Sequence, residues 1–144
     1  MYIIKGFGIH LKVTNITTSY RFYKLFDFQP VFVYGNKIFT NQFKNNIAKA
    51  DEKYHGIVFN INGTIFEIAD GHLAVKPQIF KNRVKNSKIS AMLYVNSVET
   101  IVKICQKNSI PIIVNPKIYP WGTREVVIKD PDGFVLVFIE KLPK

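Results

Sequence analysis

The order of the expected secondary-structure elements occurs twice along this chain, and this repetition restricts the fold more than any single motif. In the first copy, residues 7–13 alternate loosely between apolar and polar side chains, which predicts a strand. A helix is expected to follow, with Asn15 or Thr17 as its N-cap and its end near Phe26. Three further strands are predicted at residues 31–34, 55–60 and 64–69.

Two segments between these elements differ in how clearly their sequence predicts local structure. Asn62-Gly63 separates two predicted strands, and this pair tolerates the positive φ angles of a type I′ turn. The polar stretch 36–53 shows little periodicity. The sequence therefore predicts a hairpin over 55–69, whereas 36–53 is compatible with either a loop or a short helix.

The second copy follows residues 71–87 and has the same order. A strand at 89–95 precedes a helix at 97–108. The helix has an apolar face with i, i+3, i+4, i+7 spacing, formed by Val98, Ile101, Val102 and Cys105. Three more strands are predicted near 112–115, 123–129 and 134–140, the last two joined by the turn Asp130-Pro131-Asp132-Gly133.

The length and composition favour one core that both copies share. The chain has 144 residues, 47% of them hydrophobic, which is enough for a sizeable interior but short for two separate cores. We expect a single domain over 1–144, with module one at about 1–70, a linker at about 71–87 and module two at about 88–144. The predicted fold class is α+β: two tandem βαβββ modules form a partly open mixed β-barrel with helices outside, around a cavity.

Charge and cysteine content bear on location and partners. The net charge is +10, but residues 76–88, the densest basic stretch, lack a nucleic-acid motif, so a solvated linker and no nucleic-acid partner are expected. The lone Cys105 cannot form an internal disulfide. Residues 1–8 hold no apolar run long enough for a signal segment or a membrane span. These features predict a cytoplasmic protein with no membrane partner.

Three segments together resemble the vicinal oxygen chelate superfamily, which includes glyoxalase I, bleomycin-resistance proteins, fosfomycin-resistance enzymes and extradiol dioxygenases. They are residues 9–16 continuing through 22–28, the pair Trp121-Gly122, and the turn 130–133. The resemblance implies a site inside the barrel, built by strands of both modules. It also implies a homodimer, since many members dimerise, and a divalent metal in those members that are enzymes.

The metal-ligand positions of the superfamily fall mostly on residues that cannot bind a metal well. The resemblance places these positions at Gly8, Glu67, Ser90 and Val137. Only Glu67 carries a side chain typical of such a site. His10 lies two residues after Gly8, on the same strand face, and could replace the missing ligand if the strand bulges. We expect no metal and no other cofactor.

Six side chains are candidates for binding a ligand in the cavity: His10, Lys12, Glu67, Tyr94, Trp121 and Arg124. His10 is either a hydrogen-bonding group of the pocket or a histidine of the core. An inward Glu67 needs a partner, because burying a bare carboxylate is costly, and the ligand could be that partner. Trp121 either stacks against a guest or packs structurally.

The direction of Arg124 is left open by its strand pattern. Arg124 alternates with Val126 and Ile128, so if their face is inward the guanidinium could clamp an anionic group. If that face is outward, Glu125 and Lys129 line the inside instead.

Three hypotheses for function follow. The first is a metal-independent small-molecule binding protein of the glyoxalase/bleomycin-resistance type, with its ligand held in the barrel cavity. The second is a glyoxalase-like lyase or isomerase that uses Glu67 as general base with His10 assisting. The third, an interaction or nucleic-acid module, is supported only by the basic charge. The first is favoured because most of the metal-ligand positions are lost.

Overall fold

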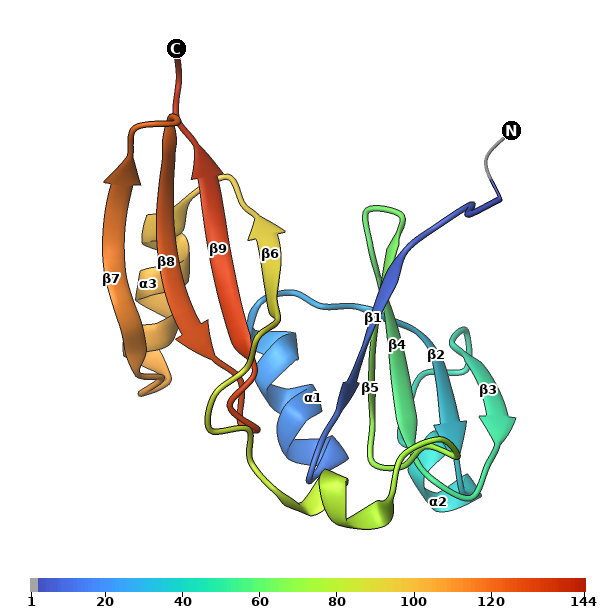
Figure 1. Ribbon diagram of the computed structural model, residues 1–144. Helices are drawn as coiled ribbons and strands as arrows, with labels where there is room; N and C mark the ends of the chain where they lie inside the picture. The colour runs from blue at the N-terminus through green and yellow to red at the C-terminus, as the bar shows by residue number, and fades with distance from the viewer. Residues whose placement is uncertain (1–2) are drawn as a thin grey trace. The chain divides into compact units, whose positions relative to one another are not determined.

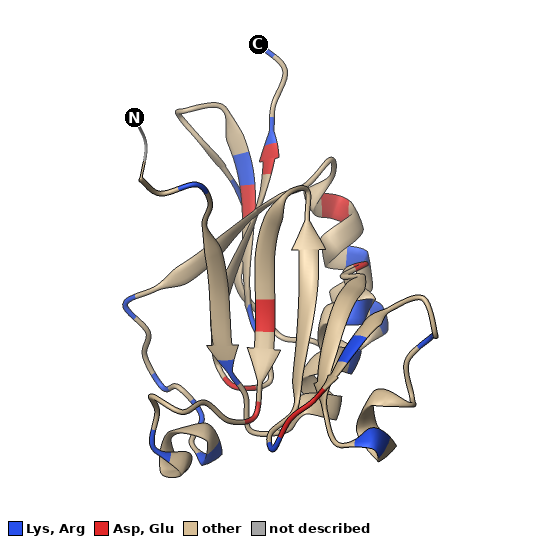
Figure 2. Cartoon of the chain, turned by 90° about the vertical axis from the view of Figure 1, so that its right-hand side faces the viewer, with Lys and Arg blue, Asp and Glu red and all other residues tan. Residues whose placement is uncertain are grey.

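The computed structural model describes residues 3–144, which divide into two compact units with the boundary between Asn82 and Arg83 (Figure 1). Each unit contains one open β-sheet with a long helix against one of its faces. Lys and Arg are spread over strands, helices and loops rather than gathered in one segment (Figure 2). Within the described residues, no helix is both long enough and apolar enough to cross a membrane.

The first unit builds a five-stranded sheet with the order β1-β5-β4-β2-β3. β1 runs parallel to β5, and β3 runs parallel to β2, whereas the two inner pairs are antiparallel. The elements are β1 (Gly8–Lys12), α1 (Ile16–Leu25), β2 (Pro30–Gly35), α2 (Lys37–Thr40), β3 (Ala48–Asp51), β4 (Gly56–Ile61) and β5 (Thr64–Ala69), followed by the 3-10 helix η1 (Pro77–Lys81).

The core of this unit lies between α1 and one face of the sheet. Ile57 and Phe59 of β4 and Phe66 and Ile68 of β5 are buried there, because side chains of a strand alternate between its two faces. Tyr23 of α1 is fully buried and its ring contacts both phenylalanine rings. Asn15 begins the helix, since its side chain accepts a hydrogen bond from the amide of Thr18.

Two local predictions for the first unit are settled by the backbone. Asn62 and Gly63 have φ angles of 49° and 92°, as the predicted hairpin turn requires. The stretch 36–53 contains the short helix α2, which the sequence allowed, and also the strand β3, which it did not predict. β3 has the sequence AKAD, which carries no strand pattern, so its conformation depends on pairing with β2.

The second unit builds a four-stranded sheet with the order β6-β9-β8-β7. Helix α3 packs on one face, where Val126, Leu136 and Phe138 are buried together with Cys105 of the helix. The expected order of strand, helix and three strands is therefore confirmed. The elements are β6 (Ser90–Tyr94), α3 (Val98–Lys107), β7 (Ile112–Tyr119), β8 (Thr123–Lys129) and β9 (Val135–Lys141).

The turn before β9 is held by Asp130. Its Oδ1 accepts hydrogen bonds from the amides of Asp132 and Phe134, at 3.0 and 2.8 Å. Gly133 has a φ of 88° and lies against the carbonyl of Val84, so a Cβ there would overlap the backbone. The predicted four-residue turn is confirmed, and it also anchors the start of the second unit.

The α+β class and the tandem strand–helix–strand modules are confirmed, with one additional strand in the first module. The sheets are not closed into a barrel, because every hydrogen-bonded strand pair in residues 3–144 lies within a single sheet. The division into one domain with a linker stays a prediction.

Candidate functional site

Each sheet has an open face opposite its helix, and the predicted site residues fall mainly on these two faces. On the first sheet, the side chains of His10 and Lys12 of β1 lie on the opposite face from the buried Leu11, and so away from α1; Gly8 is at a position of the same face. Glu67 of β5 lies directly opposite His10 across the parallel pair β1–β5. Three of the six predicted side chains, His10, Lys12 and Glu67, are therefore brought together by one strand pairing.

Glu67 has a partner within the protein. The hydroxyl of Tyr34, on β2, donates a hydrogen bond to Oε1 of Glu67 across the intervening strand β4. Burial is the largest cause that raises the pKa of Tyr34 above its usual value, and the hydrogen bond to Glu67 raises it further. Tyr34 therefore stays protonated and remains a donor to the carboxylate. The sequence analysis missed this residue.

The position of the Tyr34 ring depends on a glycine. Gly56 is the register partner of Tyr34 on β4, and a Cβ at this residue would overlap the Tyr34 ring. Because only glycine leaves that space empty, the ring can cross β4 and reach Glu67. A second aromatic ring, that of Tyr54, packs edge-on against Tyr34 with 5.9 Å between centroids.

His10 is close to Glu67 but does not bond to it. Its Nε2 lies 3.8 Å from Oε1 of Glu67, is buried, and has no hydrogen-bond partner within the described residues. The ring contacts His72, from the loop after β5, edge-on at 5.2 Å. Burial lowers the pKa of His10, while the charge of Glu67 opposes this and the charges of Lys12 and His72 add to it.

Lys12 completes this polar cluster. Its ammonium donates to the backbone carbonyl of His10 at 3.3 Å. The cluster of Tyr34, Glu67, His10, Lys12 and His72 thus holds one tyrosine, one carboxylate and one lysine, together with the imidazole of His10 on the same sheet face and that of His72 from the adjoining loop. Such groups can bind a polar ligand or move a proton.

The donors in this cluster do not fit a divalent metal of the kind that the resemblance implies. Catalytic metals usually require three protein ligands or more. Within residues 3–144, no group of three or more His, Cys, Asp or Glu side chains is placed to hold an ion. One oxygen of Glu67 is already hydrogen-bonded to Tyr34. Gly8, Ser90 and Val137 lie on open faces of their sheets and supply no imidazole or carboxylate.

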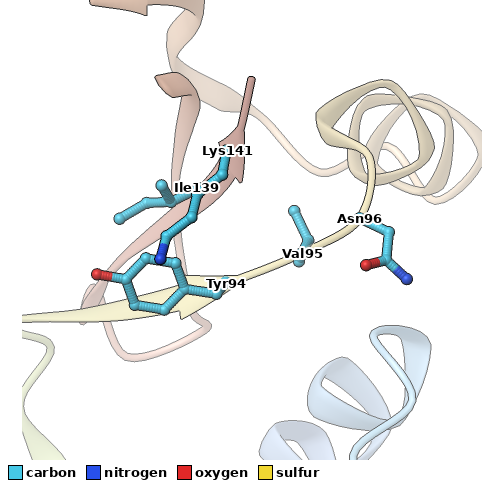
Figure 3. Close-up of a pocket in the computed structure, with 5 residues that line it drawn as sticks. All are labelled: Tyr94, Val95, Asn96, Ile139 and Lys141. Carbon is cyan, nitrogen blue, oxygen red and sulfur yellow. The ribbon is translucent and has the colours of Figure 1, made fainter. Parts of the chain in front are cut away.

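The open face of the second sheet carries two more of the predicted residues. Tyr94 of β6 is 62% exposed and lines a pocket of about 350 Å³. Lys141 of β9, which was not predicted, reaches over the Tyr94 ring with its Nζ 5.3 Å from the centroid (Figure 3).

Trp121 stacks on Tyr119, with 4.6 Å between centroids, and its Nε1 donates to Glu125 at 3.3 Å. Structural packing, one of the two roles predicted for Trp121, is therefore provided by the ring of Tyr119.

Arg124 lies on the other face. It alternates with Val126 and Ile128, which are fully buried on the side covered by α3. Its guanidinium is 3.9 Å from Glu140, whose Oε2 also accepts a hydrogen bond from the amide of Val98 at the start of the helix. The structure therefore selects the second alternative for this strand, in which Glu125 and Lys129 share the face away from the helix.

Comparison with known proteins agrees with this architecture. The sequence profile of the Glyoxalase/Bleomycin resistance protein/Dioxygenase superfamily matches residues 9–138. The chain belongs to this superfamily. Among curated proteins no match is found.

Solved structures with the same fold include proteins of several activities. The fosfomycin resistance protein FosX from Listeria monocytogenes has 12% identity and a TM-score of 0.63, over 98% of this chain and 94% of its own. A glyoxalase I variant from Zea mays has 12% identity and a TM-score of 0.69, over 96% of this chain and 46% of its own. A bleomycin resistance determinant encoded on transposon Tn5 has 16% identity and a TM-score of 0.59, over 96% and 98%. At these identities the likeness extends to the fold alone.

Proposed function

We propose that this superfamily member is a small-molecule binding protein that works without a metal. The observation that carries the proposal is the hydrogen bond from Tyr34 to Glu67. Among the metal-ligand positions that the resemblance implies, Glu67 is the one that holds a carboxylate. Its Oε1 accepts the Tyr34 hydroxyl, which reaches it over Gly56. A hydrogen bond from a neutral donor offsets part of the cost of burying the carboxylate, a task that a metal would otherwise perform.

The polar cluster gives a ligand several ways to bind. Lys12 and His72 offer donors, whereas Glu67 and the hydroxyl oxygen of Tyr34, whose proton is donated to Glu67, offer acceptors. The ligand would be sequestered without reaction. A homodimer and the absence of nucleic-acid binding are part of the same proposal.

The competing hypothesis is a lyase or isomerase in which Glu67 takes a proton from the substrate. It would lack a metal to polarise the carbonyl of the substrate, and so a large electrostatic contribution to catalysis. His10, its assumed helper, has a buried Nε2.

Thermal-shift screening against amphipathic aromatics and antibiotics tests the proposal. We expect at least one compound to stabilise the protein and to be recovered unchanged by mass spectrometry. Glu67→Gln should weaken that stabilisation, whereas Tyr54→Phe, in the neighbouring ring, serves as the control. Conversion of the compound to product would overturn the proposal in favour of an enzyme, and so would near-stoichiometric metal in freshly purified protein.

A further inference from the structure

We propose that the pocket on the open face of the second sheet binds a small organic anion, with Lys141 as the residue that pairs with the anionic group. The inference rests on the proposed function, since it names the chemical class of a ligand for a binding protein. It concerns residues of Arg83–Lys144 alone, and it does not involve the polar cluster around Glu67.

Strand pairing creates this pocket. Tyr94 of β6 lies opposite Ile139 of β9, and Lys141 follows two residues later on the same face. Val95 and Asn96, where the chain leaves β6, complete the lining. Figure 3 shows the Lys141 side chain extending to the Tyr94 ring beside Ile139. The volume of about 350 Å³ lies within the range of small-ligand sites.

The Lys141 ammonium is positioned by an aromatic ring but is not paired with a carboxylate within residues 3–144. Its Nζ lies 5.3 Å from the centroid of the Tyr94 ring, which orients the ammonium by a cation–π contact. Among the described residues, no carboxylate lies within ion-pair distance of this ammonium, whereas Lys103 and Arg124 of the same unit each have one. The hydrogen-bond donors of the ammonium are therefore available to a ligand.

The nearby carboxylates that could pair with Lys141 in place of a ligand are bonded to other groups. Glu125 is the acid on the open face, and its Oε1 accepts hydrogen bonds from Trp121 and from the hydroxyl of Thr123. Glu140 neighbours Lys141 in sequence but lies on the opposite face, where it accepts from Val98.

The other acids of this unit also have partners on the helix or in the turn. Glu99 pairs with Lys103 at 3.0 Å on α3, Asp130 holds the turn before β9, and Asp132 is buried in the same turn and has an interaction of its own.

Further lysines strengthen the positive potential of the same face. Lys117 of β7 and Lys129 of β8 share the face with Lys141, according to the register of the sheet. Clustered charges of one sign attract ligands of the opposite sign and raise their local concentration. Ile139 and Val95 provide an apolar wall, so the favoured ligand combines a carboxylate or phosphonate with an apolar group.

A small ligand is favoured over a nucleic-acid strand because the rings of this face are not free as a stacking row. Tyr119 and Trp121 stack on one another, and the ring of Tyr94 is in contact with Lys141. Strands of nucleic acid are usually bound by successive aromatic rings along a basic groove. A pocket lined by a single lysine suits a single anionic group.

The test uses one ring system with different charges. Binding of phenylphosphonate, benzoate, benzyl alcohol and benzylamine to the full chain is measured by heteronuclear NMR titration. We expect the two anions to bind with shifts centred on Tyr94 and Asn96, and the neutral and cationic analogues to bind much more weakly. Lys141→Gln should weaken anion binding by about tenfold, the size of one charge-assisted contact. Lys141→Arg should retain it.

Lys107→Gln is the matched control, because it removes one exposed cation from α3 of the same unit. Its anion affinity should equal that of the unmodified chain. Equal weakening by both variants would mean that net charge, and not Lys141, attracts the anion, and it would overturn the proposal. So would equal binding of benzyl alcohol and benzoate, failure of both anions to bind, or displacement of bound benzoate by a single-stranded oligonucleotide.

The two proposals can fail separately. If neutral or cationic compounds stabilise the protein while the anions do not bind, the binding function stands and the anion site fails. If the protein converts a compound to product, the binding function fails, and the NMR titration still decides whether Lys141 holds an anion.

Discussion

The open faces of the two sheets satisfy their polar groups in different ways. On the first sheet, Glu67 and Lys12 both bond to partners within the cluster. On the second sheet, Glu125 accepts a hydrogen bond from Trp121, whereas the ammonium of Lys141 contacts the Tyr94 ring and has no ion-pair partner within residues 3–144. A ligand of the first face must compete with internal hydrogen bonds, whereas a ligand of the second face gains a contact without breaking one. Superfamily membership alone would not distinguish these two surfaces.

Gly56→Ala should give the largest effect on the first face. The new methyl group would overlap the Tyr34 ring, so the ring must leave Glu67 or the strand must shift. Overpacking of this kind costs about 1–3 kcal/mol, measurable by urea unfolding. The same change in a Tyr34→Ala background should cost much less. Equal losses in both backgrounds would show that the Tyr34 ring is not what requires glycine.

Tyr34→Phe should have the next largest effect, because it leaves the partly buried carboxylate of Glu67 without its donor. We expect a loss of about 1–2 kcal/mol in the free energy of unfolding near neutral pH. In a Glu67→Gln background the same substitution should cost less, since a neutral amide is cheaper to leave unpaired. Tyr54→Phe, the control, should change the free energy of unfolding little. An equal loss in that variant would mean that the packing of the two tyrosine rings, and not the hydrogen bond to Glu67, is responsible.

His10→Gln should change how stability depends on pH. The pKa of His10 in the folded chain is lowered from 6.5, so protonation favours the unfolded state. The unfolded chain then binds more protons, and the unmodified protein should lose stability as the pH falls below about 6.5. Thermal melts from about pH 8 to about pH 5 should show a shallower decline for the variant. Parallel curves would contradict the burial of this imidazole.

Arg124→Gln should have the smallest effect and sharpen the contrast on the second sheet. Its partly exposed ion pair with Glu140 is expected to contribute only about 0.2–0.5 kcal/mol. Because Arg124 faces α3, benzoate binding in the NMR titration should not change. A loss of anion affinity equal to that of Lys141→Gln would place the guanidinium on the ligand side and contradict the observed alternation.

Local patterns in the sequence predicted the modules well, since turns and helix faces depend on neighbouring residues. The turns at Asn62-Gly63 and Asp130 formed as expected, and the helix cap formed at Asn15, one of the two predicted candidates. Strand β3 was missed because only its pairing with β2 makes it a strand.

The candidate site was harder to predict because its contacts join distant strands. His10, Lys12 and Glu67 could be found from alternation and the family resemblance. Tyr34 is 33 residues from Glu67 in sequence, and their contact depends on strand order and on the missing side chain of Gly56. Lys141 likewise meets Tyr94 only because β9 pairs with β6. Neither contact has a signature in one sequence.

Gly8 sets a limit on how this chain could be redesigned as a metalloenzyme. A Cβ at this residue would lie 3.0 Å from the carbonyl oxygen of Ile65, tighter than ordinary van der Waals contact. A histidine at this residue would require the backbone of β5 to shift before any ion could bind. The hydrogen bond from Tyr34 to Glu67 would also have to break. Building a metal centre at the positions that the resemblance implies is therefore a problem of backbone accommodation at the β1–β5 pair, which no single substitution of a ligand residue would solve.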